Sequence, residues 1–185
     1  MSSKRGRAAF IYLCIVLQLI GQRIGAQSSD DEYRVKAAFL FHFAQLIDWP
    51  VGTGTNNSLF LCTLGDDPFQ GALEASIAGK VIDTRILRVL HLKQPDEMHT
   101  CQILFLGNQQ SKRIPALLAT LRNTPVLTVG ETAGFLESGG MVRFLLQDNK
   151  VRFGINRTAA ESAGLKISSR LLVLAQTVLP ESGGR

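Results

Sequence analysis

Cysteines are the first residues in the chain whose type and spacing could do chemistry. Cys14 lies in an apolar N-terminal run, whereas Cys62 and Cys101 lie in the part that is expected to fold. An even pair in an exported protein is most simply a disulfide. Because a bridge needs Cα atoms about 5–6 Å apart, the pairing also predicts that the two segments are neighbours, or that a loop brings Cys101 back. Two buried thiols on neighbouring strands are the alternative.

The other candidates for catalysis or cofactor binding form no complete set. His91 and His99 lie near Cys101 and could be drawn as a soft metal site, but a disulfide would consume the cysteine. Gly79–Val81 lacks the hydroxyl residue of a phosphate-binding P-loop, and no G-x-S-x-G elbow is present. The sequence therefore predicts a protein that is not an enzyme and that has no metal and no cofactor.

Three arginines near the end of the chain could converge on an anion. Arg143 and Arg152 are predicted on the two strands of a hairpin, and Arg157 at the turn that follows it. A nearby helix N-terminus would add positive potential. A bound nucleotide or other anion would make the protein a small-ligand sensor. Solvated strand faces and surface ion pairs are the ordinary alternative.

Large apolar residues in the short connecting elements are candidates for contact with a partner protein. We expect Phe69, Phe135 and Leu136 to be exposed and to bind a partner, because interfaces favour such anchors at their centres. A homodimer is a second expectation for the same reason. A position in the core is the alternative for each residue.

The charge distribution separates a leader from a nearly neutral domain. The chain has 185 residues and a formal net charge of +5, and residues 1–26 hold four of its 20 basic residues and none of its 15 acidic ones. The 16 basic and 15 acidic residues that remain argue against a nucleic-acid-binding surface. A basic start, an apolar run over 8–20 and the small residues before Gln27 predict a signal peptide over 1–26, with no membrane insertion after its removal. An uncleaved anchor is the alternative. The expected location is the periplasm.

Residues 30–50 are predicted to form the long helix around which the domain is organised. Asp30, Asp31 and Glu32 favour a helix N-terminus, and Pro50 disfavours helical geometry at Trp49. The apolar arc between them is wider than one core face needs. The helix is therefore either buried on most sides or uses part of this surplus to bind a partner.

Short strands and helices alternate along the rest of the chain. The predicted strands are 58–64, 80–90, 101–106, 125–129, 141–146 and 151–155, and the predicted helices are 68–78, 111–122, 131–137, 157–163 and 171–178. Such alternation implies a mainly parallel sheet flanked by helices, and the last two strands should form an antiparallel hairpin. We expect one mixed α/β domain over 27–179 and a disordered tail over 180–185.

Six stretches are distinctive in their order and spacing. They are YRVKAAFLFHFAQLIDWP, LCTLGDDPF, CQILFLG, VLTVGETAGFLESGGMVRF, VRFGIN and GLKISSRLLVLA. Together they run from about Tyr33 to Ala175, which is nearly all of the mature chain. In this order they resemble the YfiR family of small bacterial periplasmic proteins.

The resemblance implies an α/β fold and a regulatory role without catalysis. Members of this family repress an inner-membrane diguanylate cyclase by binding its periplasmic sensor region, and their release raises cyclic di-GMP and promotes biofilm formation. The resemblance also implies that Cys62 and Cys101 match a family disulfide that keeps the repressor folded. Some members carry a further cysteine pair near the terminal hairpin. Residues 141–156 contain no cysteine, so a second disulfide that controls the repressor by redox state is not expected there.

Overall fold

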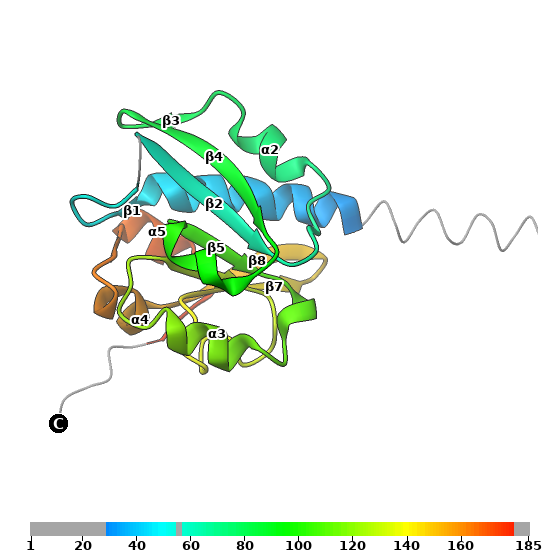
Figure 1. The fold of residues 1–185 in the computed structure, drawn as a ribbon. Helices are drawn as coiled ribbons and strands as arrows, with labels where there is room; N and C mark the ends of the chain where they lie inside the picture. Colours follow the sequence, from blue (N-terminus) through cyan, green and yellow to red (C-terminus); the bar gives the residue numbers. More distant parts are fainter. Residues whose placement is uncertain (1–28, 55–56, 180–185) are drawn as a thin grey trace, which may run out of the picture.

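A long N-terminal helix and a twisted sheet make up most of the computed structural model, which describes residues 29–54 and 57–179 (Figure 1). The predicted signal peptide and the predicted disordered tail lie outside these residues. The long helix is described over 29–46. The other helices are α2 (Ala72–Ile77), α3 (Ile114–Thr120), α4 (Arg157–Ser162) and α5 (Ser169–Leu174), with the short 3-10 helices η1 (Pro95–Thr100) and η2 (Asn108–Gln110). The strands are β1 (Ile47–Asp48), β2 (Ser58–Leu64), β3 (Val81–Ile82), β4 (Arg85–Leu92), β5 (Ile103–Leu106), β6 (Leu127–Gly130), β7 (Val142–Gln147), β8 (Lys150–Asn156), β9 (Lys166–Ile167) and β10 (Thr177–Leu179).

Eight strands form one sheet in the order β10-β8-β7-β6-β5-β2-β4-β3. The pairs from β7 through β6, β5 and β2 to β4 are parallel, and so is the pair of β10 with β8. The β7–β8 hairpin and the β3–β4 pair are antiparallel. The predicted α/β fold, with a mainly parallel sheet flanked by helices and a hairpin near its end, is confirmed.

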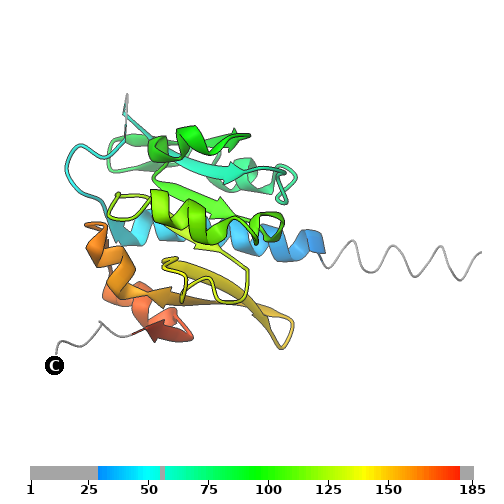
Figure 2. The same ribbon diagram turned by 60° about the horizontal axis from the view of Figure 1, so that its bottom comes forward.

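The sheet carries a hydrophobic core on each face. The long helix packs on one face, where Phe43 and the half-buried Phe39 meet Phe144 and Phe153 of the hairpin at ring-centroid distances of 5.1–6.1 Å. Helix α3 covers the opposite face, as the second view shows (Figure 2). Burial of this face of the long helix confirms part of the expectation for its wide apolar arc.

The cysteine pair forms the predicted disulfide. The two Cα atoms are 5.9 Å apart, and both residues are buried. Cys62 lies in β2 opposite Leu104 of β5, while Cys101 precedes β5 and follows η1. The loop therefore brings Cys101 back to the neighbouring strand, and the alternative of two free thiols is wrong.

The predicted helix over 131–137 does not form, and turns take its place. Gly134 and Gly139 have positive φ angles of 75° and 95°, which a continuous α-helix cannot contain. The ring of Phe135 fills the space in front of Gly140, where an added Cβ would lie 2.2 Å from a ring carbon. The segment is shaped by this tertiary contact and not by helix propensity.

Several other predicted elements have different bounds, and the long helix predicted over 30–50 ends at residue 46, before β1. The strand over 80–90 is a tight β3–β4 hairpin, with Asp83 at φ 54° in its turn. The helix predicted over 171–178 ends at Leu174, and the chain then enters β10 beside β8. Helix α2 begins only at Ala72, because the Asp67 carboxylate accepts a hydrogen bond from the N–H of Phe69 in a preceding turn.

Candidate protein-binding surface

The long helix leaves part of its apolar arc uncovered beside the β7–β8 hairpin. One hollow of about 630 Å³ is lined by Asp31, Arg34, Val35, Ala38, Phe39 and His42. A second, of about 430 Å³, is lined by Asp31, Glu32, Val35, Phe39, Leu146, Asn149, Lys150 and Val151. Because the two share Asp31, Val35 and Phe39, they form one continuous depression, which we call the helix–hairpin groove.

The groove has an apolar floor and a charged rim. Val35 is 44% exposed and Leu146 is 52% exposed, both high values for large aliphatic side chains. Phe39 is half-buried and is held by the aromatic cluster beneath it. Charges of both signs lie at the edge, from Asp31, Glu32, Arg34 and Lys150. An apolar centre with a polar rim is the usual anatomy of a protein–protein interface.

A buried ion-pair network fixes the first turns of the helix on the sheet. Lys36 Nζ lies 2.5 Å from Glu131 Oε2 and 2.5 Å from Glu32 Oε1, and the side chains of Lys36 and Glu131 are only 5% and 6% exposed. Glu131 directly follows β6, and its Oε1 also accepts a hydrogen bond from the N–H of Asn108 after β5. The network thus joins the helix to the carboxyl ends of two neighbouring parallel strands.

Tyr33 completes this network. Its hydroxyl donates to Glu131 Oε1 at 3.0 Å, and Lys36 Nζ lies 4.3 Å from the centre of its ring. Burial raises the pKa of the Tyr33 phenol, and the negative charge of Glu131 and the hydrogen bond to it raise that pKa further. The phenol therefore stays protonated well into the alkaline range and remains a donor to Glu131.

The residues predicted to anchor a partner are buried. Phe69, Phe135 and Leu136 are 2%, 1% and 6% exposed, so the expectation that they form an exposed surface is wrong. The ring of Phe69 packs edge-on against Phe105 at 4.9 Å, and Phe135 lies between Gly130 and Gly140. Each residue fills a core that the sequence pattern does not distinguish from a surface site.

The three arginines predicted to bind an anion lie on three successive elements, β7, β8 and α4. Arg143 and Arg152 lie on the same face of the hairpin. Arg152 pairs across the strands with Leu145, and Leu145 is two residues from Arg143 on β7, so the three side chains point to one face. Arg157 lies beyond the end of β8, where its Nε donates to Glu161 Oε1 at 2.6 Å within α4. Anion binding by these three arginines stays a prediction.

Among the described residues, one group of three could approach a metal ion. Ligand atoms of Asp67, Glu74 and His91 lie within 4.8 Å of one another. However, His91 Nε2 already meets Glu74 Oε1 at 2.6 Å, and His91 Nδ1 meets the Thr63 hydroxyl at 2.8 Å. These hydrogen bonds account for the arrangement, and neither His99 nor Cys101 belongs to the group.

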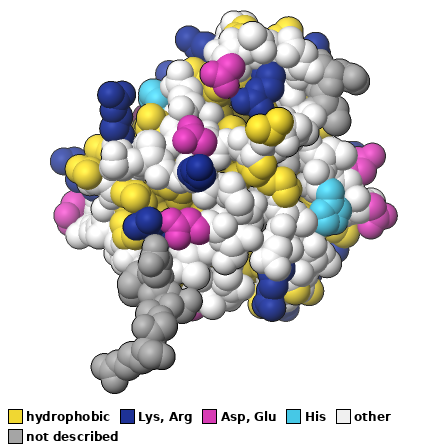
Figure 3. Space-filling model, turned by 90° about the vertical axis from the view of Figure 1, so that its left-hand side faces the viewer, with side chains coloured by type: hydrophobic (Ala, Val, Ile, Leu, Met, Phe, Trp, Pro, Cys, Tyr) yellow, Lys and Arg dark blue, Asp and Glu magenta, His cyan; other side chains and the backbone are white. Residues whose placement is uncertain are grey.

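The side of the molecule seen in Figure 3 differs from the groove. There, hydrophobic side chains lie in several small patches that single charged side chains separate. Helix α5 exposes Val173 and Leu174, which are 83% and 64% exposed. This α5 pair provides a second apolar surface against which the helix–hairpin groove can be tested.

Comparison with known proteins identifies the family. A family model described as YfiR/HmsC-like matches residues 33–176, which include the long helix, the disulfide, the hairpin and α5. The chain belongs to the YfiR/HmsC-like family. This family consists of periplasmic regulators of cyclic di-GMP signalling, and its role is regulatory and not catalytic. The resemblance seen in the sequence is confirmed over nearly the same range.

Two solved structures resemble the chain at low identity. One is an ABC domain in complex with L-Trp from Streptococcus pneumonia, with a TM-score of 0.48, 10% identity, and coverage of 70% of this chain and 58% of that one. The other is a conserved domain protein from Vibrio cholerae, with a TM-score of 0.49, 12% identity, and coverage of 70% and 57%. The chain therefore spans little more than half the length of either.

Within the described residues, no helix combines the length and the apolar character that crossing a membrane requires. The long N-terminal helix carries Asp31, Glu32, Arg34 and Lys36 in its first turns.

Proposed function

We propose that this protein represses an inner-membrane diguanylate cyclase by binding the periplasmic region of that enzyme. Repression lowers cyclic di-GMP, and release of the repressor promotes biofilm formation. The match of residues 33–176 to the YfiR/HmsC-like family carries the proposal. The lack of an assembled catalytic set in the sequence agrees with a protein that acts by binding.

The helix–hairpin groove is the proposed contact surface. Val35 and Leu146 are exposed on its two sides, and Phe39 between them is held in place by packing beneath. A preformed apolar surface loses little side-chain entropy when a partner covers it. An apolar segment of the cyclase's periplasmic region is the expected occupant, with an acidic group facing Lys150 at the rim.

The disulfide gives this proposal a redox link. Reduction of Cys62–Cys101 removes a constraint on the unfolded chain, so it lowers the fraction of folded repressor that is able to bind. Both cysteines are buried, so reduction requires local opening of the segment that contains η1. The proposed release is therefore slower than the chemistry of thiol exchange alone.

Crosslinking in intact cells, followed by identification of the attached proteins, tests the proposal. The wild-type protein is expected to capture a diguanylate cyclase from the inner membrane, and its deletion is expected to raise cyclic di-GMP. Capture of no cyclase, together with unchanged cyclic di-GMP in the deletion strain, would refute the function itself.

Matched variants test the surface separately. Val35→Glu places a charge on the apolar lining of the groove and is expected to weaken capture about tenfold or more. Val173→Glu makes the same change on the exposed face of α5 and is expected to leave capture unchanged. Loss of capture with Val173→Glu but not with Val35→Glu would move the interface to α5 and leave the proposed function standing.

A further inference from the structure

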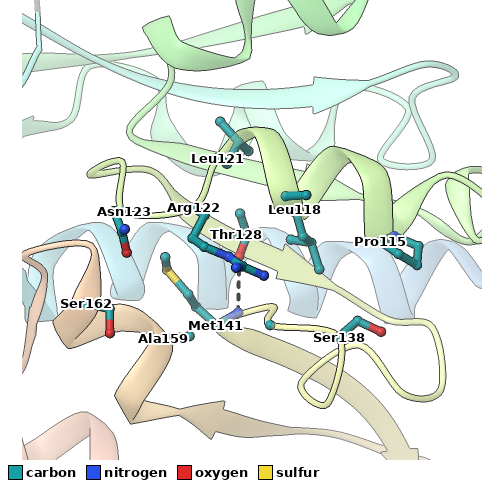
Figure 4. A pocket seen from close by; sticks show the side chains of 12 residues that line it. Pro115, Leu118, Leu121, Arg122, Asn123, Thr128, Ser138, Met141, Ala159 and Ser162 are labelled. Carbon is teal, nitrogen blue, oxygen red and sulfur yellow. Dashed lines mark hydrogen bonds between the residues drawn. The ribbon is translucent and has the colours of Figure 1, made fainter.

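A small cavity lies on the other side of the sheet from the long helix. It opens between the end of α3, strand β6, the loop before β7 and helix α4, and its volume is about 210 Å³ (Figure 4). It is separate from the helix–hairpin groove, since the two share no lining residue. Leu118, Leu121 and Met141 supply much of its apolar wall.

The cavity has one positive charge and no negative one. Arg122 follows α3, and its side chain extends across the cavity towards Thr128 and Met141 (Figure 4). Among the described residues, Arg122 makes no ion pair and no side-chain hydrogen bond, and the lining contains no Asp or Glu. Asn123, Ser138 and Ser162 add polar groups at the wall. A cation in such surroundings favours an anion.

Thr128 provides a second and independent reason to expect a ligand. Its side chain lines the cavity although the residue is only 1% exposed. Its hydroxyl oxygen accepts a hydrogen bond from the N–H of Met141 at 3.1 Å, but within the described chain the hydroxyl hydrogen has no acceptor. A buried donor without an acceptor is unfavourable, so a ligand atom that accepts this hydrogen bond from Thr128 would be stabilised in the cavity.

We infer that this cavity binds a small molecule that joins a carboxylate to a short apolar group. The carboxylate accepts hydrogen bonds from the Arg122 guanidinium and from the Thr128 hydroxyl, and the apolar group contacts Leu118, Leu121 and Met141. Arg pairs with carboxylates through two parallel N–H···O bonds, which suits a planar anion. This site is distinct from the three arginines on and after the hairpin.

The size of the cavity limits the ligand. Pockets for drug-sized molecules usually measure about 300–1,000 Å³, so a cavity of about 210 Å³ takes a smaller molecule. Phenylacetate, with about ten non-hydrogen atoms, is a suitable probe, and a dissociation constant on the order of 1 mM is expected for a ligand of this size. Phenylacetamide has the same shape without the charge and is the matched control.

The test is an NMR titration of the oxidised, signal-free protein with each probe. Phenylacetate is expected to shift the amide signals of Thr128 and Met141 and the side-chain signal of Arg122, and these shifts should saturate in the millimolar range. Phenylacetamide is expected to leave them unchanged. Equal shifts with both probes, or no saturable shift up to about 10 mM phenylacetate, would overturn the inference.

Two variants connect the shifts to the site. Arg122→Gln should weaken phenylacetate binding about tenfold or more, because it removes a charged hydrogen-bond donor. Arg122 is exposed, so the substitution should leave the fold intact. Arg170→Gln makes the same substitution on α5 and should bind like the wild type. Unchanged binding by Arg122→Gln, or equal weakening in both variants, would show that the guanidinium of Arg122 does not hold the ligand.

Discussion

Replacing Lys36 with methionine removes the cation from a buried network and leaves the carboxylate of Glu131 without its charge partner. The side chain of Glu131 is only 6% exposed, and the two groups are 2.5 Å apart. Breaking a buried ion pair by removing one partner typically costs about 3–5 kcal/mol. The hydrogen bonds from Tyr33 and the Asn108 N–H persist, so we expect the lower end of this range.

Thermal and urea unfolding of Lys36→Met measures this effect. For a domain of this size, about 3 kcal/mol corresponds to a fall in Tm of roughly 6–12 °C. The double variant Lys36→Met/Glu131→Gln also removes the carboxylate charge, so it is expected to be more stable than Lys36→Met alone.

Arg34→Ala is the matched control in the same helical segment. Its guanidinium lies 3.7 Å from Asp31, and its side chain is 73% exposed, so its loss should cost less than about 1 kcal/mol. A loss of less than about 1 kcal/mol for Lys36→Met as well would refute the view that the network fixes the helix on the sheet.

Two further predictions concern pH and the disulfide. Since the folded-state pKa of Tyr33 is raised, the unfolded chain loses this proton first, and stability is expected to fall as pH rises above about 10. Tyr33→Phe should lose less stability over the same range in pH-dependent urea titrations, and an equal loss would contradict the assignment. Replacing Cys62 and Cys101 with alanine should lower the free energy of unfolding by about 4 kcal/mol for the closed loop of 39 residues, and unchanged urea midpoints would contradict this.

Local patterns identify the central part of the fold. The apolar run at Ser58–Leu64 forms β2 with the predicted bounds, and the polar turn after Gln147 joins two strands as predicted, with Asp148 and Asn149 at positive φ. Asn156 and Ser168 cap their helices with side-chain hydrogen bonds, as capping residues commonly do. Such features depend on residues close together in the sequence, so one sequence contains the information.

Features that depend on distant contacts could not be predicted in this way. Thr177–Leu179 became a strand because β8 offered it a free edge, and Phe135 is buried because Gly130 and Gly140 leave room for its ring. The pairing of Lys36 with Glu131 joins residues 95 positions apart, and neither has a distinctive neighbourhood in the sequence. The same holds for Arg122 and Thr128, which only the folded chain brings to one cavity.

The long helix also depends on contacts with residues far along the chain. Glu131, Phe144 and Phe153, which hold the helix in place, all lie in the later half of the chain. The disulfide instead joins Cys62 to Cys101, so it closes around β2 and β4 before any of these residues. Contacts between residues so far apart in the sequence slow folding. Until these late contacts form, the part of the aromatic face that they cover is exposed and is open to aggregation or to a chaperone.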